Sequence, residues 1–267
     1  MELPLYQVDA FAVDVFSGNP AAIVPLQDWL PDHTMQAVAM ENNVAETAFF
    51  VAGDGDYQLR WFTPTVEVDL CGHATLASAH VLFEHLGFSE NEIVFQTRGG
   101  ELRVSKAQGR LTLDFPAVEL TSVPVEANIC NALGGAAQAV EAVVARNNPH
   151  ALVYVFSNES EVADLNPNAA QLLASSPHSV IATARGSQCD FVSRFFGPHV
   201  GIDEDPVTGS AHCSLVPYWA AKLDKALLQA RQISPRGGDL ACELRNGRVF
   251  MTGSAVTFMQ GVIYLPD

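Results

Sequence analysis

The segment CGHATLASAHVLFEHL, residues 71–86, and the segment TGSAHCSLVPYWAAKL, residues 208–223, decide the fold of this chain. Each has a glycine at its second position, Gly72 or Gly209, and then runs through apolar residues that fall on most faces of a helix. A helix that is apolar nearly all round must be enclosed by other elements rather than lie on a surface. We therefore expect two related, buried helices.

Sequence markers on both sides of these segments repeat at a nearly constant distance. RGGEL at 98–102 returns as RGGDL at 236–240, and the pair Gly109-Arg110 returns as Gly247-Arg248, both 138 residues later. RWFTP at 60–64 is matched by RFFGP at 194–198, which lies 134 residues later. Ordered matches at one spacing are typical of an internal repeat, so the sequence predicts two similarly folded halves.

Short β-like runs precede and follow the helix of the first half, bounded by Gly, Pro, Asn or Asp. They lie at 21–26, 46–51, 57–62, 92–97 and 110–115. The predicted fold class is α+β, with two pseudo-symmetric domains that each wrap a strongly curved sheet around a central helix. Smaller helices are expected at 31–42 and 167–175. Pro217 should kink the second central helix, because proline removes one backbone hydrogen bond.

The join between the halves is expected in DFPAVELTSVPVEA, residues 114–127, where prolines accompany a loss of periodicity. The predicted domains are 1–116 and 117–255. The last β-like run, 255–264, can pair with either half, and the segment 256–267 is a candidate addition to the first domain.

The composition limits the classes of partner. The chain has 267 residues, a net charge of −16 and a pI near 4.7, so its field repels phosphate backbones and anionic lipid surfaces. We therefore expect no nucleic-acid partner and no membrane partner. No window approaches the roughly 18 apolar residues of a membrane span. The five cysteines are scattered without a CxxC motif, which indicates reduced thiols in a cytoplasmic protein and no metal site.

The starts of the two central helices offer the clearest chemistry. A helix N-terminus carries unpaired N–H groups and a partial positive charge, so two ends at Gly72 and Gly209 would suit an anionic ligand. The alternative is that both glycines serve tight turns. His73 follows the first glycine, where an imidazolium is disfavoured, and is either a neutral proton carrier or a structural histidine. Ser210 follows the second glycine and is a candidate N-cap.

Carboxylates complete the candidate site. Asp205 lies in the acidic run Asp203–Asp205 just before the second helix, and is either a site residue or part of a solvated loop. Glu46 is the only charged residue of the strand-like run NNVAETAFFVA, residues 42–52. Shielded from water there, it would be suited to acid or base work; the alternative is an edge-strand residue that faces solvent.

The motifs GNPAAIV, NNVAETAFF, RWFTPTVEVDLCGHATLASA, EDPVTGSAHCSL and RGGDL resemble, in this order, the phenazine-biosynthesis (PhzF-type) family. That family is related to the diaminopimelate-epimerase-like superfamily, and the resemblance covers roughly residues 5–264. It implies two barrel-like mixed sheets, each around a central helix, with a site between them. It also implies a cofactor-free isomerase that moves a proton on a small unsaturated carboxylic acid, and a homodimer.

The resemblance assigns a role to each candidate. Glu46 occupies the position of the acid and base, and His73, Asp205 and Ser210 match the assisting catalytic residues. Asn19 of the GNPA motif is a candidate for substrate contact. The epimerase relatives use two opposed cysteines. Cys71 matches the first, and near a helix N-terminus it would be partly thiolate.

Thr208 stands at the second cysteine position and is too weak an acid for that role, which disfavours a two-thiol racemase. We therefore expect a cofactor-independent isomerase acting on a small, unsaturated or cyclic carboxylic acid. Substrate binding is assigned to Asn19, Gly72, Thr208 and Gly209. One alternative is a module that binds a small molecule or a protein without turnover. The other is a racemase or epimerase that depends on Cys71.

Overall fold

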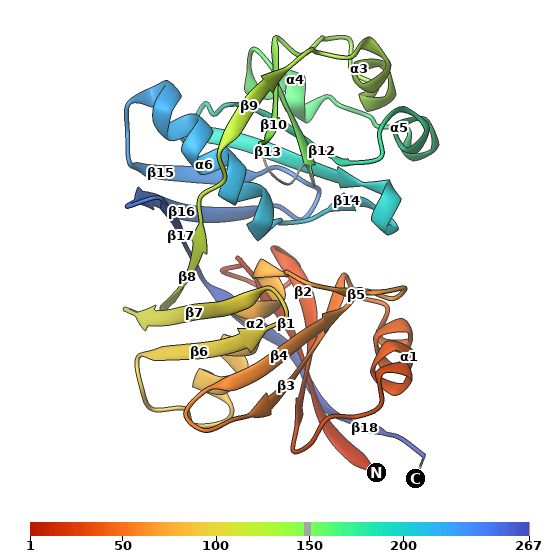
Figure 1. Cartoon of the computed structure of the whole chain (residues 1–267), viewed down its shortest axis with the longest axis vertical. Coiled ribbons are helices and arrows are strands. Elements are labelled where there is room, and N and C mark those ends of the chain that lie inside the picture. The colour runs from red at the N-terminus through yellow and green to blue at the C-terminus, as the bar shows by residue number, and fades with distance from the viewer. Residues whose placement is uncertain (147–150, 267) are drawn as a thin grey trace. The chain divides into compact units, whose positions relative to one another are not determined.

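The computed structural model describes residues 1–146 and 151–266, and the chain divides into two compact units (Figure 1). Unit 1 comprises Met1–Asp114 and the chain from Met251 onward, and unit 2 comprises Phe115–Phe250. The expected C-terminal segment 256–267 is thus described as far as residue 266. No helix of the described residues has the length and hydropathy that a membrane crossing requires.

Unit 1 contains most of the first half of the chain. Its elements are β1 (Glu2–Ala10), β2 (Asn19–Leu26), α1 (Asp32–Asn42), β3 (Glu46–Ala52), β4 (Tyr57–Phe62), β5 (Glu67–Val68), α2 (Gly72–Glu84), β6 (Glu92–Thr97), β7 (Gly100–Ala107), β8 (Arg110–Pro116) and the C-terminal β18 (Ala255–Tyr264). The strands run in the order β18-β1-β2-β3-β4-β6-β7-β8, in which only β2–β3 and β4–β6 are parallel. The short β5 pairs with the end of β4.

Unit 2 repeats this arrangement. Its elements are β9 (Leu120–Val123), α3 (Ala127–Leu133), β10 (Glu141–Ala145), β11 (Ala151–Val155), α4 (Glu159–Ala163), α5 (Ala169–Ser175), β12 (Ser179–Arg185), β13 (Phe191–Gly197), the 3₁₀ turn η1 (Pro198–Val200), β14 (Ile202–Asp205), α6 (Gly209–Leu223), β15 (Leu227–Gln232), β16 (Gly238–Arg245) and β17 (Arg248–Gly253). The order is β9-β10-β11-β12-β13-β15-β16, with β11–β12 and β13–β15 parallel and β14 on the end of β13. The predicted duplication is therefore visible strand by strand.

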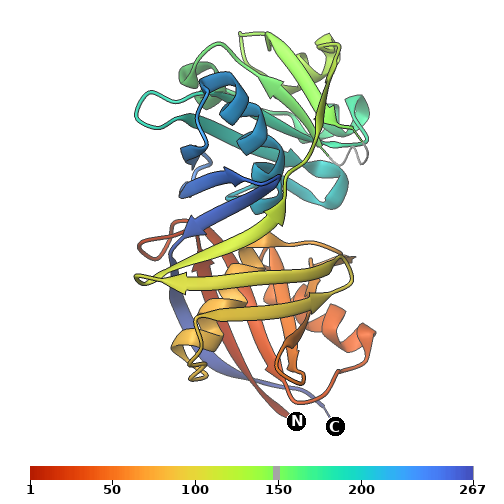
Figure 2. The ribbon, with the colours of Figure 1, turned by 60° about the vertical axis from the view of Figure 1, so that its left-hand side comes forward.

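The two repeats exchange one strand. In the chain β9 follows β8, the last strand of the first repeat, but it pairs with β10 of unit 2. In the same way β18 follows β17, the last strand of the second repeat, but pairs with β1 of unit 1 along its whole length. Figure 2 shows β18, in blue, beside β1, in red, and the two ends of the chain are joined by hydrogen bonds between Met1 and Leu265. The open question of which half takes the last strand is thus answered in favour of unit 1.

The central helices are enclosed as predicted. α2 packs against β1, β2, β3, β7 and β18, and ten of its thirteen residues are buried. Its two hydroxyl residues hydrogen-bond within the helix, Thr75 to the carbonyl of Cys71 at 2.6 Å and Ser78 to that of Ala74 at 2.8 Å. Back-bonding of this kind lets an enclosed helix carry hydroxyl groups without leaving them unsatisfied.

α6 accommodates Pro217 by a compensating bond. A proline at this position cannot donate to the carbonyl of Cys213, four residues earlier. The backbone N–H of Val118 donates to that carbonyl instead, at 3.0 Å. Pro217 weakens α6, but the carbonyl that it leaves free binds the segment before β9 to this helix.

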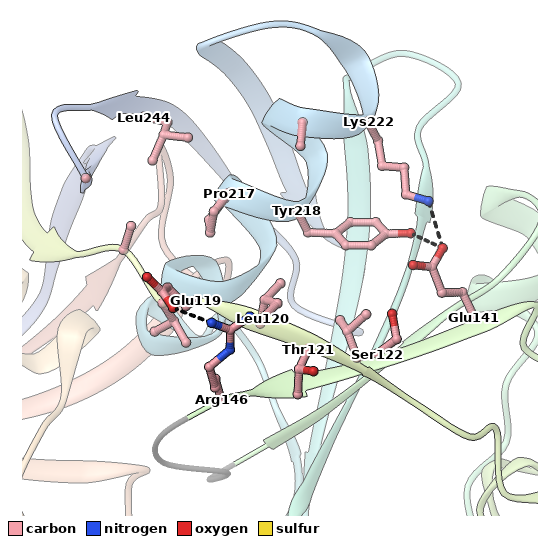
Figure 3. Close-up of a pocket in the computed structure, with 15 residues that line it drawn as sticks. Glu119, Leu120, Thr121, Ser122, Glu141, Arg146, Pro217, Tyr218, Lys222 and Leu244 are labelled. Atoms are coloured by element: carbon pink, nitrogen blue, oxygen red, sulfur yellow. Dashed lines mark hydrogen bonds and ion pairs between the residues drawn. The ribbon is translucent and has the colours of Figure 1, made fainter.

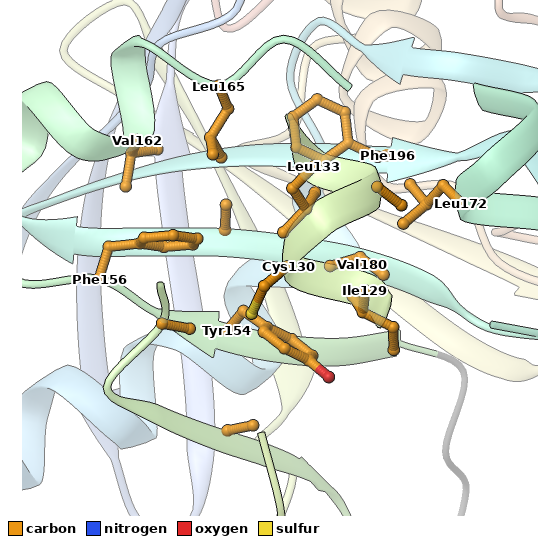
Figure 4. Packing of buried hydrophobic residues seen from close by; sticks show 14 of the residues in the cluster. Ile129, Cys130, Leu133, Tyr154, Phe156, Val162, Leu165, Leu172, Val180 and Phe196 are labelled. Carbon is orange, nitrogen blue, oxygen red and sulfur yellow. The ribbon is translucent and has the colours of Figure 1, made fainter. Parts of the chain in front are cut away.

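Helices also cover the outer face of each sheet. In unit 2, β12 is buried on both faces: Val180, Ala182 and Ala184 face the cluster with α3, α4 and α5, while Thr183 accepts a hydrogen bond from Trp219 of α6 at 3.0 Å. Figure 4 shows this cluster, with Ile129 and Leu133 of α3 lying over the strands. In unit 1, α1 plays the same part through Met35 and Val38.

The sequence predicted α1 and α5 but missed α3 and α4. Both lie in the stretch that shows no match to the first repeat, and they are only seven and five residues long.

Candidate functional site

Three of the predicted site residues meet inside unit 1. Asn19 begins β2, Glu46 begins β3, and these strands are parallel neighbours, so both side chains start from the same edge of the sheet. His73 is the second residue of α2 and follows the N-cap Cys71. Relative exposures are 0% for Asn19, 8% for Glu46, 4% for His73 and 5% for Cys71, so the group is dry. The water-facing alternative for Glu46 does not hold.

His73 uses its two ring nitrogens on different neighbours. Nε2 lies 3.0 Å from Oε2 of Glu46, and Nδ1 lies 3.1 Å from Nδ2 of Asn19 and 3.6 Å from Sγ of Cys71. The Asn19 amide can present either its nitrogen or its oxygen to Nδ1, so it can pair with the neutral ring or with the imidazolium, and in both forms Nε2 carries a proton toward the carboxylate. The His73–Glu46 pair lacks hydrogen-bond alignment, and neither atom makes a hydrogen bond elsewhere in residues 1–146 and 151–266.

The electrostatics of this group favour a charged pair. Burial alone lowers the pKa of His73, but the neighbouring Cys71 and Glu46 outweigh burial and hold that pKa well above its ordinary value. Burial and the Glu46 charge raise the pKa of the Cys71 thiol to about 11. Cys71 is therefore a neutral thiol near pH 7, and the charge that supports an imidazolium comes from Glu46. The expectation of a partly ionised Cys71 was wrong, because burial outweighs the helix N-terminus.

Glu46, Cys71 and His73 also form a cluster of metal-ligand types, with their ligand atoms within 4.8 Å of one another. Their arrangement is that of a relay rather than a chelate. Cys71 faces Nδ1 of the imidazole and Glu46 faces Nε2, so an ion bound to either ring nitrogen would have one of them behind the ring. The donor atoms of metal ligands instead surround one point and are all directed at it.

A second group forms in unit 2, at the turn between β14 and α6. Asp205 is 6% exposed and accepts a hydrogen bond of 2.5 Å from the hydroxyl of Thr208. Gln232, the last residue of β15, is fully buried and bonds to the backbone of both residues. Sequence reasoning missed Gln232, because nothing in an alternating strand such as LLQARQ distinguishes an inward-facing glutamine from a solvent-exposed one.

The three acidic residues before α6 differ in burial and in their partners. Asp203 is exposed, Asp205 is buried, and Glu204 is held by Arg194 through two bonds of 2.7 and 2.9 Å. Ser210 is not the N-cap of α6: that position is Thr208, and Ser210 is an exposed residue of the first helical turn. The prediction of a capping serine was wrong, because the helix begins at Gly209 and its cap therefore lies two residues before Ser210.

The Arg194–Glu204 pair has a counterpart in unit 1, and sequence reasoning missed both. Arg60 binds Glu67 through bonds of 2.7 and 2.8 Å. Each arginine opens an RWF or RFF motif, and each glutamate stands five residues before the glycine of a central helix. The duplicated motif was the available signal. Two bidentate pairs therefore anchor the short strands β5 and β14, which lead into α2 and α6.

Described separately, unit 1 brings together Asn19, Glu46, Cys71 and His73, with Gly72 at the start of α2, and unit 2 brings together Asp205 and Thr208, with Gly209 and Ser210 in the first turn of α6.

Unit 2 also has a groove of about 840 Å³ between α6 and strands β9 and β10 (Figure 3). Tyr218 and Lys222 line it from α6, and both bind Glu141 of β10. The matching place in unit 1 is bridged, because His80 and His85 lie 2.9 and 2.7 Å from the Thr257 hydroxyl of β18. None of the predicted site residues lines this groove.

Comparison with known proteins shows to which family the chain is similar. The family model described as "Phenazine biosynthesis-like protein" matches residues 8–261. An uncharacterized isomerase of Pseudomonas aeruginosa is 49% identical, over 99% of this chain and all of that protein. A human phenazine biosynthesis-like domain-containing protein is 38% identical, over 98% of this chain and 99% of its own.

The fold comparison agrees. The crystal structure of a PhzF-family phenazine biosynthesis protein from Enterococcus faecalis matches with a TM-score of 0.94 and 45% identity, over 99% of this chain and all of that one. The predicted fold class is confirmed. The chain belongs to the phenazine biosynthesis-like, or PhzF, family.

Proposed function

We propose that the protein is a cofactor-independent isomerase that moves a proton on a small carboxylic acid, with Glu46 as acid and base. The observation that carries this proposal is the buried pair of Glu46 and His73, whose facing atoms Oε2 and Nε2 lie 3.0 Å apart and make no hydrogen bond among the described residues. A dry carboxylate beside an imidazole can take a proton from one site and return it at another. Positioned acid–base groups of this kind typically contribute a factor of ~10² to 10⁴ in rate.

In this mechanism Glu46 removes a proton from carbon and His73 supports its change of charge. A carboxylate that becomes neutral on protonation leaves the imidazolium without its partner, so the proton is returned readily. Asn19 holds Nδ1 and thereby keeps the Nε2 edge of the ring turned to Glu46. The pKa of His73, raised through Cys71 and Glu46 against the effect of burial, keeps a proton available beside the base.

The substrate carboxylate needs local donors, because the chain as a whole carries a charge of −16. The N-terminal turns of α2 and α6 are suited to this. In the described chain neither N-cap side chain, Cys71 or Thr208, makes a capping hydrogen bond, so the usual side-chain partner of the first-turn N–H groups is missing at both. Such groups bind anions and stabilise an enolate-like charge. We assign carboxylate binding to Gly72 in unit 1 and to Gly209 with the Ser210 hydroxyl in unit 2, and proton transfer in unit 2 to Asp205 with Thr208.

Homologues support the reaction class rather than the substrate. The relative from Pseudomonas aeruginosa is named an isomerase, and a further one from Halalkalibacterium halodurans carries the same description. The class that these features favour is a small unsaturated or cyclic acid, whose enolate-like intermediate can accept a proton at more than one carbon.

The test is proton exchange with solvent. A panel of unsaturated and cyclic carboxylic acids is incubated with the protein in heavy water, and deuterium uptake at carbon is followed by NMR. We expect uptake with wild type and with Glu41→Gln, which makes the same change at an exposed position of α1. We expect none with Glu46→Gln. Binding of an acid without exchange would show a binding module, and exchange that survives in Glu46→Gln would remove Glu46 from the mechanism.

A further inference from the structure

Gln232 is a fully buried polar side chain of unit 2 that makes three hydrogen bonds. It ends β15, has no exposed surface, and reaches the turn that joins β14 to α6. Its Oε1 accepts from the backbone N–H of Thr208 at 2.8 Å. Its Nε2 donates to the carbonyl of Asp205 at 2.7 Å and to the hydroxyl of Thr208 at 3.2 Å.

These contacts fix the orientation of the amide. A backbone N–H only donates and a backbone carbonyl only accepts, so the reverse orientation would place donor against donor and acceptor against acceptor. With the amide fixed, the Thr208 hydroxyl oxygen receives a hydrogen from Gln232. Its own hydrogen is then directed to Oδ2 of Asp205, at 2.5 Å.

We propose that Gln232 is a positioning residue that acts on Asp205 through Thr208. It makes the Thr208 hydroxyl a donor to the Asp205 carboxylate and holds the two backbone groups of the turn in place. Donation to a carboxylate favours its ionised form. Gln232 thereby keeps the Asp205 carboxylate ionised and fixes its orientation. The proposal rests on the proposed function, in which Asp205 belongs to the proton path, and it names a residue that does not itself contact substrate.

The experiment reads Asp205 directly and needs no substrate. The protein is labelled with ¹³C at aspartate carboxyl carbons, the Asp205 signal is assigned by its loss in Asp205→Asn, and its titration midpoint is measured. We expect Gln232→Met to move the midpoint upward by about one pH unit, the size of one hydrogen bond to a charged group. Thr208→Val should move it in the same direction, and the double variant should move it no further than Thr208→Val does.

The matched control is Gln229→Met, which makes the same change three residues earlier, on the exposed face of β15. It should leave the midpoint in place. The other titratable or charged side chains on the elements around Asp205 are Asp203 and Glu204 of β14, Arg194 of β13, His199 of η1, His212, Cys213, Tyr218 and Lys222 of α6, and Arg231 of β15. They are the same in every variant, so the difference reports Gln232.

A purely packing role predicts a different result. In that case Gln232→Met lowers stability but leaves the Asp205 midpoint unchanged, and this outcome would overturn the proposal. If Gln232→Met does not fold, Gln232→Glu keeps the size of the side chain and an acceptor for the Thr208 N–H while losing both donors. It should again raise the midpoint, and an unchanged midpoint would contradict the proposal. Because no substrate is used, this result is independent of the exchange experiment on Glu46.

Discussion

His73 and Glu46 face each other across 3.0 Å inside unit 1, in a place that is almost free of solvent. Burying either charged side chain alone costs more free energy than burying it beside the other, so the protonation of His73 is coupled to folding. We therefore expect the pair to affect the stability of the protein as well as its proposed chemistry.

Stability should fall as the pH rises above neutrality. The folded-state pKa of His73 is raised through Cys71 and Glu46 against burial, so its contribution is complete below the unfolded-state value of about 6.5 and is lost as pH rises through the folded-state value. We expect the free energy of unfolding to fall in that window by up to about 1.4 kcal/mol per pH unit. Urea denaturation between pH 6 and 9 measures this slope. Glu46→Gln should flatten it and Glu41→Gln should not; equal slopes in both variants would exclude the coupling.

Cys71 should be dispensable for proton transfer. Its pKa, raised to about 11 by burial and by Glu46, leaves little thiolate near pH 7. Cys71→Ala is expected to retain solvent exchange within about tenfold, whereas loss of a positioned acid or base typically costs ~10² to 10⁴. Iodoacetamide at pH 7.5 should modify Cys71 only slowly in the native protein. Loss of all exchange in Cys71→Ala would instead favour the cysteine-dependent epimerase.

Arg194 should be one of the most sensitive positions of unit 2. Its side chain is 10% exposed, binds both oxygens of Glu204, and donates at 2.7 Å to the carbonyl of Leu165. An ammonium cannot reproduce this fork of donors. We expect Arg194→Lys to lower the free energy of unfolding markedly and Arg194→Met to lower it by about 3–5 kcal/mol, as for other broken buried pairs. Urea denaturation measures both.

The control for Arg194 is Arg231→Lys, at a residue that is 55% exposed and lies 3.6 Å from Asp239. It should change stability by less than about 0.5 kcal/mol. Similar losses for the two lysine variants would show that the bidentate geometry is unimportant.

His212 should contribute to unfolding in acid. Burial lowers its pKa to about 4, against the hydrogen bond from Nδ1 to the Thr208 carbonyl at 2.8 Å, and its Nε2 makes no hydrogen bond in the described chain. The neutral form is therefore favoured in the folded state. Its stabilising contribution is present above pH 6.5 and is lost as pH falls toward 4, by roughly 3 kcal/mol. His212→Gln should reduce this acid loss, which urea denaturation from pH 7 to 4 measures. A change at exposed His33 should not.

The architecture could be predicted from the sequence because the same motifs recur in both halves of the duplicated chain. The enclosed helices follow from apolar residues on most faces, and the hairpins follow from Gly109 and Gly247. Both of these glycines have positive φ, 76° and 73°, and each follows a second positive-φ residue, Gln108 or Asn246, as a two-residue turn requires. Where the repeats have diverged, as in α3 and α4, the only remaining signal was local propensity, which short helices do not carry.

The site was only partly predictable. Glu46 and His73 could be identified because they are isolated polar residues in apolar runs. Asn19 was also a candidate, but its contact with His73 across 54 residues could not be predicted, and neither could the contact of Gln232 with Asp205 across 27. Errors arose where local rules were applied to positions that tertiary packing controls. The Cys71 thiol is governed by burial rather than by its place beside a helix, and the cap of α6 lies two residues before Ser210.

The exchange of β9 and β18 also fixes the order in which the protein is completed during synthesis. Unit 2 consists of Phe115–Phe250 alone, so it has been translated before β18 is made. Unit 1 needs β18, which follows unit 2 in the chain, and until it is made β1 lacks its pairing with that strand. The half of the chain that is made first is therefore the half that is finished second, the reverse of the usual N-terminal-first order.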